Sequence, residues 1–172
     1  RHEVCVVGGM LQINAVASAI FGSINGIQLV PIAAQPGFTS YCDAAVNSTG
    51  VGAPISASGS PSIAANDIVL TVDDLPQGQP GLYYYGPDQA QHAFGDGWRC
   101  VSGPPGTIER LWPFVHSGPM GFASRALDLG NLPGGGTVTA GQTLNFQLWY
   151  RDPAANAAGF NLSDGLSILF GP

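Results

Sequence analysis

Residues 143–170, TLNFQLWYRDPAANAAGFNLSDGLSILF, indicate the fold of this chain. From residue 144 to residue 151, large apolar side chains at even positions alternate with Asn, Gln, Trp and Arg at odd positions. A period of two places the four apolar groups on one face of an extended strand. Asp152-Pro153 should end this strand, because proline has no N–H to offer a ladder. Alternation resumes at Leu166, Ile168 and Phe170, so the chain is expected to return as a second strand.

Composition extends this interpretation to the whole chain. Its 172 residues include 25 Gly and 14 Pro but no Lys and only two Glu, so long helices are disfavoured. Short candidate strands separated by Gly and Pro clusters are typical of an all-β, two-sheet β-sandwich in jelly-roll or Greek-key style. The strands expected after residue 40 span residues 54–60, 67–73, 81–86, 89–94, 98–102, 108–115, 121–129, 144–151 and 166–170.

Charge narrows the range of partners. The net charge is −6, with five Arg and no Lys. Nucleic acid and anionic membranes are therefore disfavoured, because a protein needs a dense basic patch to neutralise phosphates. Charged residues make up only 9% of the chain, against about 25% in an ordinary soluble domain. We expect a surface of uncharged polar residues, or one hidden by protein or glycan.

The first 40 residues differ from the rest. No charged residue occurs from Val4 to Cys42. Strands are expected at residues 4–7 and 27–34, and polar residues interrupt the segment too often for a membrane span. We therefore divide the chain into an uncharged, extended N-terminal arm, residues 1–40, and a β-sandwich domain, residues 41–172.

The three cysteines, Cys5, Cys42 and Cys100, have no C-x-x-C spacing. This spacing disfavours a zinc site, and one disulfide plus one odd thiol is the simplest interpretation. The odd cysteine could pair between chains. The chain begins at Arg1 rather than Met, which is consistent with a processed, exported product.

Several motifs resemble one known family. The combination FGDGWRC, WYRDPA and FNLSDG, together with GAPISASGSPSIAANDIVLTVDDLP and YYYGPDQ, is similar to a domain common near the C-termini of secreted planctomycete proteins. The resemblance covers residues 41–172. It implies an exported, all-β, non-catalytic module at the cell surface or outside the cell.

Candidate catalytic and metal residues are scattered. His2, His92 and His116 lie far apart in the sequence, without a recognisable nucleophile elbow, so we do not expect an enzyme or a cofactor. Asp96 and Asp164 are weak candidates for calcium ligands. Asx-turns, in which the side chain bonds nearby backbone, explain both more simply.

Other residues point to glycans. Asn47 and Asn161 each begin an N-x-[ST] acceptor pattern for N-glycosylation. Trp149 and Trp98, with Trp112 and the tyrosine run at residues 83–85, could form a platform on which sugars stack. Trp149 is the best candidate because it lies opposite the apolar face of its strand, although the arm could cover that outer face instead.

Two functions remain open at this level. The favoured one is a non-enzymatic extracellular structural protein that self-assembles into a filament or surface polymer. Its apolar arm would be an aggregation hazard if left free, and adding it as a strand to a neighbour's sheet edge would bury it. Further copies of the chain are then its partners. The alternative is a carbohydrate-binding or adhesive module of a secreted protein.

Overall fold

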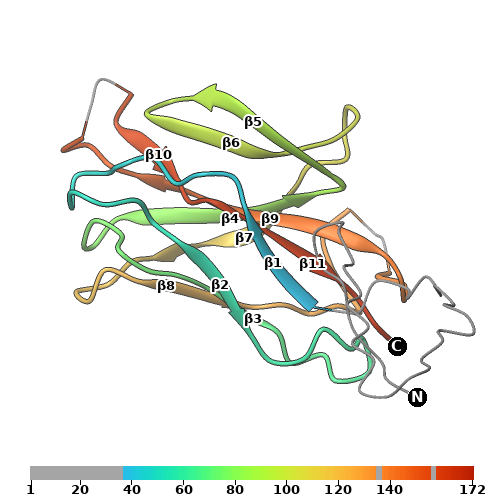
Figure 1. Ribbon diagram of the computed structural model, residues 1–172. Coiled ribbons are helices and arrows are strands. Elements are labelled where there is room, and N and C mark those ends of the chain that lie inside the picture. Colours follow the sequence, from blue (N-terminus) through green and yellow to red (C-terminus); the bar gives the residue numbers. More distant parts are fainter. Residues whose placement is uncertain (1–36, 135–136, 156–157) are drawn as a thin grey trace, which may run out of the picture. The chain divides into compact units, whose positions relative to one another are not determined.

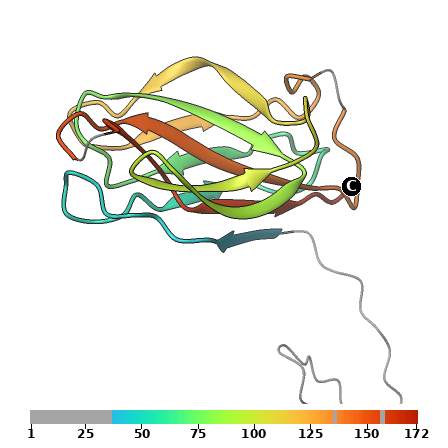
Figure 2. The same ribbon diagram turned by 90° about the horizontal axis from the view of Figure 1, so that it is seen from above.

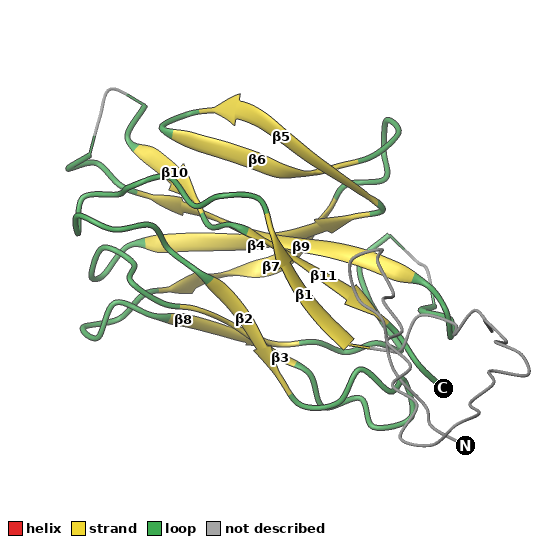
Figure 3. Ribbon diagram, viewed as in Figure 1, coloured by secondary structure: helices red, strands yellow, loops and turns green. Residues whose placement is uncertain are grey.

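The computed structural model describes residues 37–134, 137–155 and 158–172. These residues form eleven strands and no helix (Figures 1 and 3). The expectation of an all-β chain is therefore confirmed for the described residues. The strands expected at residues 4–7 and 27–34, and most of the predicted arm, lie outside them.

The strands form three antiparallel units. The six-stranded sheet has the order β1-β11-β9-β4-β7, and β10 also pairs with β9. Its strands are β1 (Gly37–Tyr41), β4 (Pro80–Gly86), β7 (Glu109–His116), β9 (Thr143–Arg151), β10 (Phe160–Leu162) and β11 (Gly165–Leu169). The three-stranded sheet has the order β2-β3-β8, with β2 (Ile55–Ser58), β3 (Val69–Val72) and β8 (Ala123–Ala126). The third unit is a hairpin of β5 (Asp88–Phe94) and β6 (Gly97–Ser102).

One core joins the two larger sheets in a sandwich-like arrangement. The even-numbered apolar residues of β9 are all buried in it, as their alternation predicts. Phe146 lies opposite Tyr85 of β4 on one side and Leu166 of β11 on the other. From the second sheet, Leu70 and Val72 of β3 pack into the same cluster.

The odd-numbered face of β9 is also covered. Asn145 and Gln147 are buried, although polar residues there would ordinarily face water. The β5–β6 hairpin lies over this outer face, against β9, β4 and β10 (Figures 1 and 2). A second, smaller cluster of Tyr84, Val101 and Leu162 fills the space beneath the hairpin. The hairpin thus covers part of the face for which the sequence suggested the arm.

Two strands differ from the sequence expectation. β1 runs through residues 37–41 and pairs with β11, so it crosses the predicted boundary between arm and domain at residue 40. β10 has only three residues and pairs with the end of β9. Gly159, just before it, and Asn161, within it, are turn formers, which is why the local pattern did not indicate a strand.

Candidate functional site

An open groove lies on the outer face of the six-stranded sheet, between β7 and the β5–β6 hairpin. Its volume is about 490 Å³. We call it the aromatic groove, and its lining residues are Leu82, Tyr84, Phe94, Arg99, Ile108, Arg110, Trp112, Phe114, Trp149 and Leu162. Apolar grooves with a few convergent polar groups are the usual form of a ligand site.

The floor of the aromatic groove follows from the alternation of β4. Tyr83 and Tyr85 point into the main core, so Leu82 and Tyr84 face the opposite side. Leu82 lies directly opposite Trp149 of β9 in the sheet register. The tyrosine run is therefore split between the core and the groove, and only its middle member contributes to the site.

One wall is formed by β7. Trp112 and Phe114 are 56% and 45% exposed, and their rings meet edge to face with centroids 4.9 Å apart. Arg125 of β8 holds the backbone of this wall, because its guanidinium donates to the carbonyls of Trp112 and Pro113. Arg125 therefore fixes the strand that carries these two aromatic side chains, while their rings remain open to solvent.

Phe94 of β5 and Trp149 of β9 form the opposite wall, and the ring of Phe160 packs between them. Phe94 of β5 packs on Phe160 at 5.3 Å between centroids, and Phe160 packs on Trp149 at 5.7 Å. Gly95 has φ +64°, which suits the first central position of a type II′ hairpin turn. A Cβ at Gly95 would also collide with the ring of Phe160. Glycine at this turn thus lets the hairpin approach β10 closely enough to complete the wall.

Two arginines bring positive charge to the aromatic groove. Arg99 enters from β6 and Arg110 from β7. Within the described residues, no carboxylate lines the groove, and the Nε of Arg99 is shielded from solvent without a hydrogen-bond partner. Burial raises the pKa of Tyr84 well above its usual range, while the nearby charge of Arg99 lowers it in part. The Tyr84 hydroxyl is therefore neutral, and it donates to Oε1 of the buried Gln147.

Gln147 anchors the hairpin to the sheet. Its Nε2 donates to the carbonyl of Trp98 at 2.8 Å and to that of Ser163 at 2.6 Å. Its Oε1 accepts from the backbone N–H of Cys100 at 2.8 Å and from the hydroxyl of Tyr84. All the hydrogen-bonding capacity of this buried amide is used, so Gln147 fixes β6, and with it one side of the groove.

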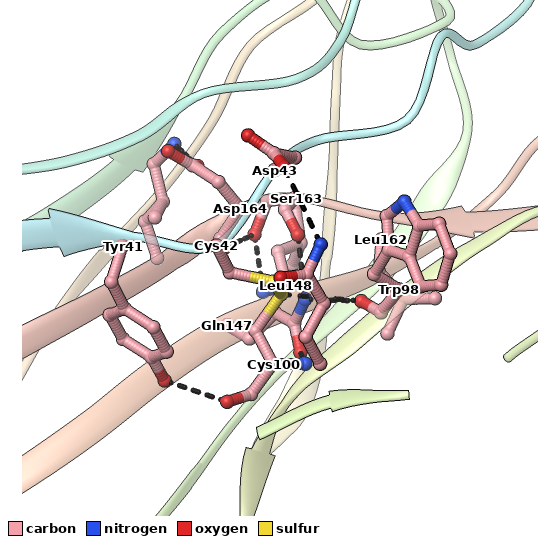
Figure 4. The surroundings of a disulfide bond; sticks show 12 residues. Tyr41, Cys42, Asp43, Trp98, Cys100, Gln147, Leu148, Leu162, Ser163 and Asp164 are labelled. Atoms are coloured by element: carbon pink, nitrogen blue, oxygen red, sulfur yellow. Dashed lines mark hydrogen bonds between the residues drawn. A yellow bond between two sulfur atoms is a disulfide. The ribbon is translucent and has the colours of Figure 1, made fainter. Parts of the chain in front are cut away.

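A disulfide provides a second anchor. Cys42, just after β1, is bonded to Cys100 of β6 (Figure 4). The hydroxyl of Tyr41 donates to the Cys100 carbonyl at 2.9 Å beside it. In the described residues, the structure therefore pairs two of the three candidate cysteines. Cys5 lies outside the described residues.

The two tryptophans singled out as sugar-stacking candidates separate in the structure. Trp149 lines the aromatic groove, whereas Trp98 is not among its lining residues. Trp98 precedes Arg99 on β6, and neighbouring residues of a strand point to opposite faces. Sequence reasoning missed Phe94, Phe114 and both arginines. Arg110, Trp112 and Phe114 occupy alternate positions on one strand, and this spacing could have indicated that they share a face.

The calcium candidates bind backbone instead. Asp164 Oδ1 accepts from the N–H of Ile55 at 2.6 Å, and Asp96 Oδ1 from that of Ala158 at 3.4 Å. These partners are distant in sequence, so the Asx-turn interpretation does not describe these two bonds. No group of three or more His, Cys, Asp and Glu residues suited to a metal ion occurs in the described part of the chain.

Both candidate glycosylation sites are buried. The Nδ2 of Asn47 donates to the carbonyl of Asp74 at 2.9 Å and to the hydroxyl of Tyr150 at 3.1 Å. Burial raises the pKa of Tyr150 to about 12, so this hydroxyl is neutral. Asn161 is fully buried, and its Nδ2 donates to the Val46 carbonyl at 3.3 Å. The folded chain therefore presents neither amide nitrogen for attachment of a glycan.

The described histidines lie on separate strands. His92 is on β5, and His116 ends β7. Beside His116, the hydroxyl of Ser117 donates to the Pro76 carbonyl and accepts from the N–H of Gln79. This serine thus braces a turn. His2 lies outside the described residues.

Helices with the length and hydropathy of a membrane span are absent from the residues that the structure describes. Comparison with known proteins finds no match to a family model, a curated protein or a solved structure.

Proposed function

We propose that this chain is a non-enzymatic, extracellular binding module that holds a carbohydrate chain in its aromatic groove. The observation that carries the proposal is the pair of aromatic walls that flank an open floor, Trp112 and Phe114 on one side and Phe94 and Trp149, joined by Phe160, on the other. The C–H faces of a sugar ring pack well on aromatic faces, and an extended polymer needs an open groove rather than a closed cavity.

The exposure of these rings supports a binding role. Exposed contiguous apolar surface on a soluble domain ordinarily marks an interaction site. Trp112, Phe114 and Phe94 are each close to half exposed, yet Arg125 and the β5–β6 turn hold their strands in place. Preorganised aromatic side chains lose little conformational entropy when a ligand binds.

Location and fold are part of this proposal. The Cys42–Cys100 disulfide supports an oxidising compartment, in agreement with the resemblance to secreted planctomycete domains. Successive strands β7, β8 and β9 alternate between the two larger sheets, which supports a sandwich with jelly-roll or Greek-key connections.

The matched substitutions Phe114→Ala and Phe122→Ala test the groove. The two side chains are 45% and 46% exposed, but only Phe114 lines it. The purified full chain would be run by affinity electrophoresis through gels that contain neutral or acidic polysaccharides. We expect the unmodified chain to be retarded in at least one gel. Phe114→Ala and Trp112→Ala should no longer be retarded, whereas Phe122→Ala should be retarded like the unmodified chain. Equal retardation of all variants, or no retardation in any gel, would contradict the proposal.

A second candidate function is self-assembly through the arm. One observation favours it: β1, which continues directly from the arm, is an edge strand of the six-stranded sheet. At the other edge, Arg125 occupies the Trp112 and Pro113 carbonyls of β7, so β1 is the edge better suited to strand addition. Deleting residues 1–36 should abolish any filaments visible by negative-stain microscopy. Filaments of the truncated chain would exclude the arm as the linker.

A further inference from the structure

We infer that the aromatic groove is built for an acidic sugar chain, in which units bearing a carboxylate are interspersed with neutral units. This inference rests on the proposed carbohydrate-binding function and specifies its ligand. It follows from how charge and aromatic rings are distributed along the groove floor.

The aromatic rings gather at the level of Leu82. Across β9, the residue opposite Leu82 is Trp149. On the β7 side, the register runs from Gly81 opposite Val115 to Tyr83 opposite Leu111, so the segment facing Leu82 contains Trp112 and Phe114. A bulge here lets both rings stand beside one floor residue. This part of the groove offers aromatic faces on both sides and suits an uncharged sugar face.

The positive charge gathers two residues further along, at the level of Tyr84. Arg110 lies directly opposite Tyr84 in the sheet register. Arg99 lines the same groove and precedes Cys100, whose N–H donates to the same Gln147 oxygen as the Tyr84 hydroxyl, so Arg99 also lies beside Tyr84. Two residues along a strand correspond to about 7 Å, comparable with the length of one sugar unit. A sugar stacked at the aromatic level would therefore place the next unit between the two guanidinium groups.

The part of the groove at Tyr84 lacks a carboxylate that could pair with its two arginines. The Nε of Arg99 is shielded from water without a partner in the described residues, and no carboxylate lines the groove. A shielded donor without an acceptor is unfavourable, and a guanidinium matches the geometry of a carboxylate through paired N–H donors. The chain as a whole carries a net charge of −6. The positive charge in the groove is thus local and opposite in sign to that of the molecule.

The same charges argue against other occupants. A dense polyanion such as nucleic acid would need many basic residues and would be repelled by the net charge of −6. The chain's own arm has a single carboxylate, Glu3, and no charge from Val4 to Cys42, so it would leave at least one of the two arginines covered without a partner. A neutral polysaccharide could stack on the rings but would leave the guanidinium groups without a counter-charge.

Titration calorimetry with hyaluronan oligosaccharides, in which every second sugar is a uronate, tests the inference. The matched ligand is the same oligosaccharide with its carboxyl groups reduced to alcohols. The matched variants are Arg99→Gln and Arg110→Gln in the groove and Arg151→Gln on an exposed position outside it. All three change the net charge equally, and thermal melting checks their folding.

We expect binding of hyaluronan by the full chain, about tenfold weaker binding of the reduced form, and about tenfold weaker binding by each groove variant. Arg151→Gln should bind like the unmodified chain, and binding of the latter should weaken as NaCl rises. Equal affinity for both ligands, without an effect of the groove arginines, would overturn this inference but leave carbohydrate binding intact. Tighter binding of heparin or single-stranded DNA would also overturn it. Failure to bind any polysaccharide would refute the proposed function itself.

Discussion

Replacing Gln147 with alanine should remove a substantial part of the stability of the domain. The side chain is fully buried and forms four hydrogen bonds, to Tyr84, Trp98, Cys100 and Ser163. At about 1 kcal/mol for each bond, the substitution lowers the free energy of unfolding by about 4 kcal/mol. Small domains have a total of about 5–15 kcal/mol, so the variant should fold but unfold at much lower denaturant.

Urea unfolding followed by tryptophan fluorescence measures this difference. Gln142→Ala is the matched control, because the Gln142 side chain accepts from the exposed Thr139, and the loss of this side chain should lower the unfolding free energy by no more than about 1 kcal/mol. Gln147→Leu separates hydrogen bonding from volume, since leucine fills similar space but leaves the same four partners unsatisfied. If Gln147→Ala is no more destabilising than Gln142→Ala, the amide does not anchor the hairpin as described.

Three further outcomes follow from the same contacts. Replacing Cys42 and Cys100 with serine opens a disulfide that spans 58 residues. Loss of this constraint on the unfolded chain should lower the unfolding free energy by about 4 kcal/mol. An unchanged denaturation midpoint would contradict this prediction. Gly95→Ala should lower the melting temperature and weaken ligand binding, because the new Cβ meets Phe160, whereas unchanged binding would show that the wall adapts. Burial raises the pKa of Asp164, so the folded chain holds this proton more tightly than the unfolded chain, and this contribution to stability declines as pH rises above the unfolded pKa. Asp164→Asn should therefore gain stability relative to the unmodified chain as pH rises from 3 to about 7, and a difference that does not vary with pH would refute the assignment.

The sheet core could be predicted from the sequence because alternation determines which face of a strand is apolar. Leu144 to Tyr150 alternate as expected, and the even residues form the centre of the main core. What alternation does not reveal is what covers the other face. Gln147 has the pattern of an exposed residue, yet the β5–β6 hairpin buries it. Such burial depends on contacts between distant segments.

The groove could be predicted only in part for the same reason. Trp149 was identified because its strand was clear, but Arg99 and Arg110 come together only through the pairing of β7 with β4 and the docking of the hairpin. At Asn47 and Asn161, by contrast, the sequence pattern indicated glycosylation sites that the fold buries. Three residues define the pattern, whereas burial of the amide depends on Tyr150, Asp74 and Val46.

The most direct test of the central claim is amide chemical-shift mapping of the isotope-labelled full chain during titration with hyaluronan hexasaccharide. The account predicts saturable shifts confined to β4, β7, the β5–β6 hairpin and the Trp149 end of β9, with the indole N–H signals of Trp112 and Trp149 shifting and that of Trp98 moving less. Saturable shifts centred on β2, β3 and β8, or no shift at any concentration, would contradict it.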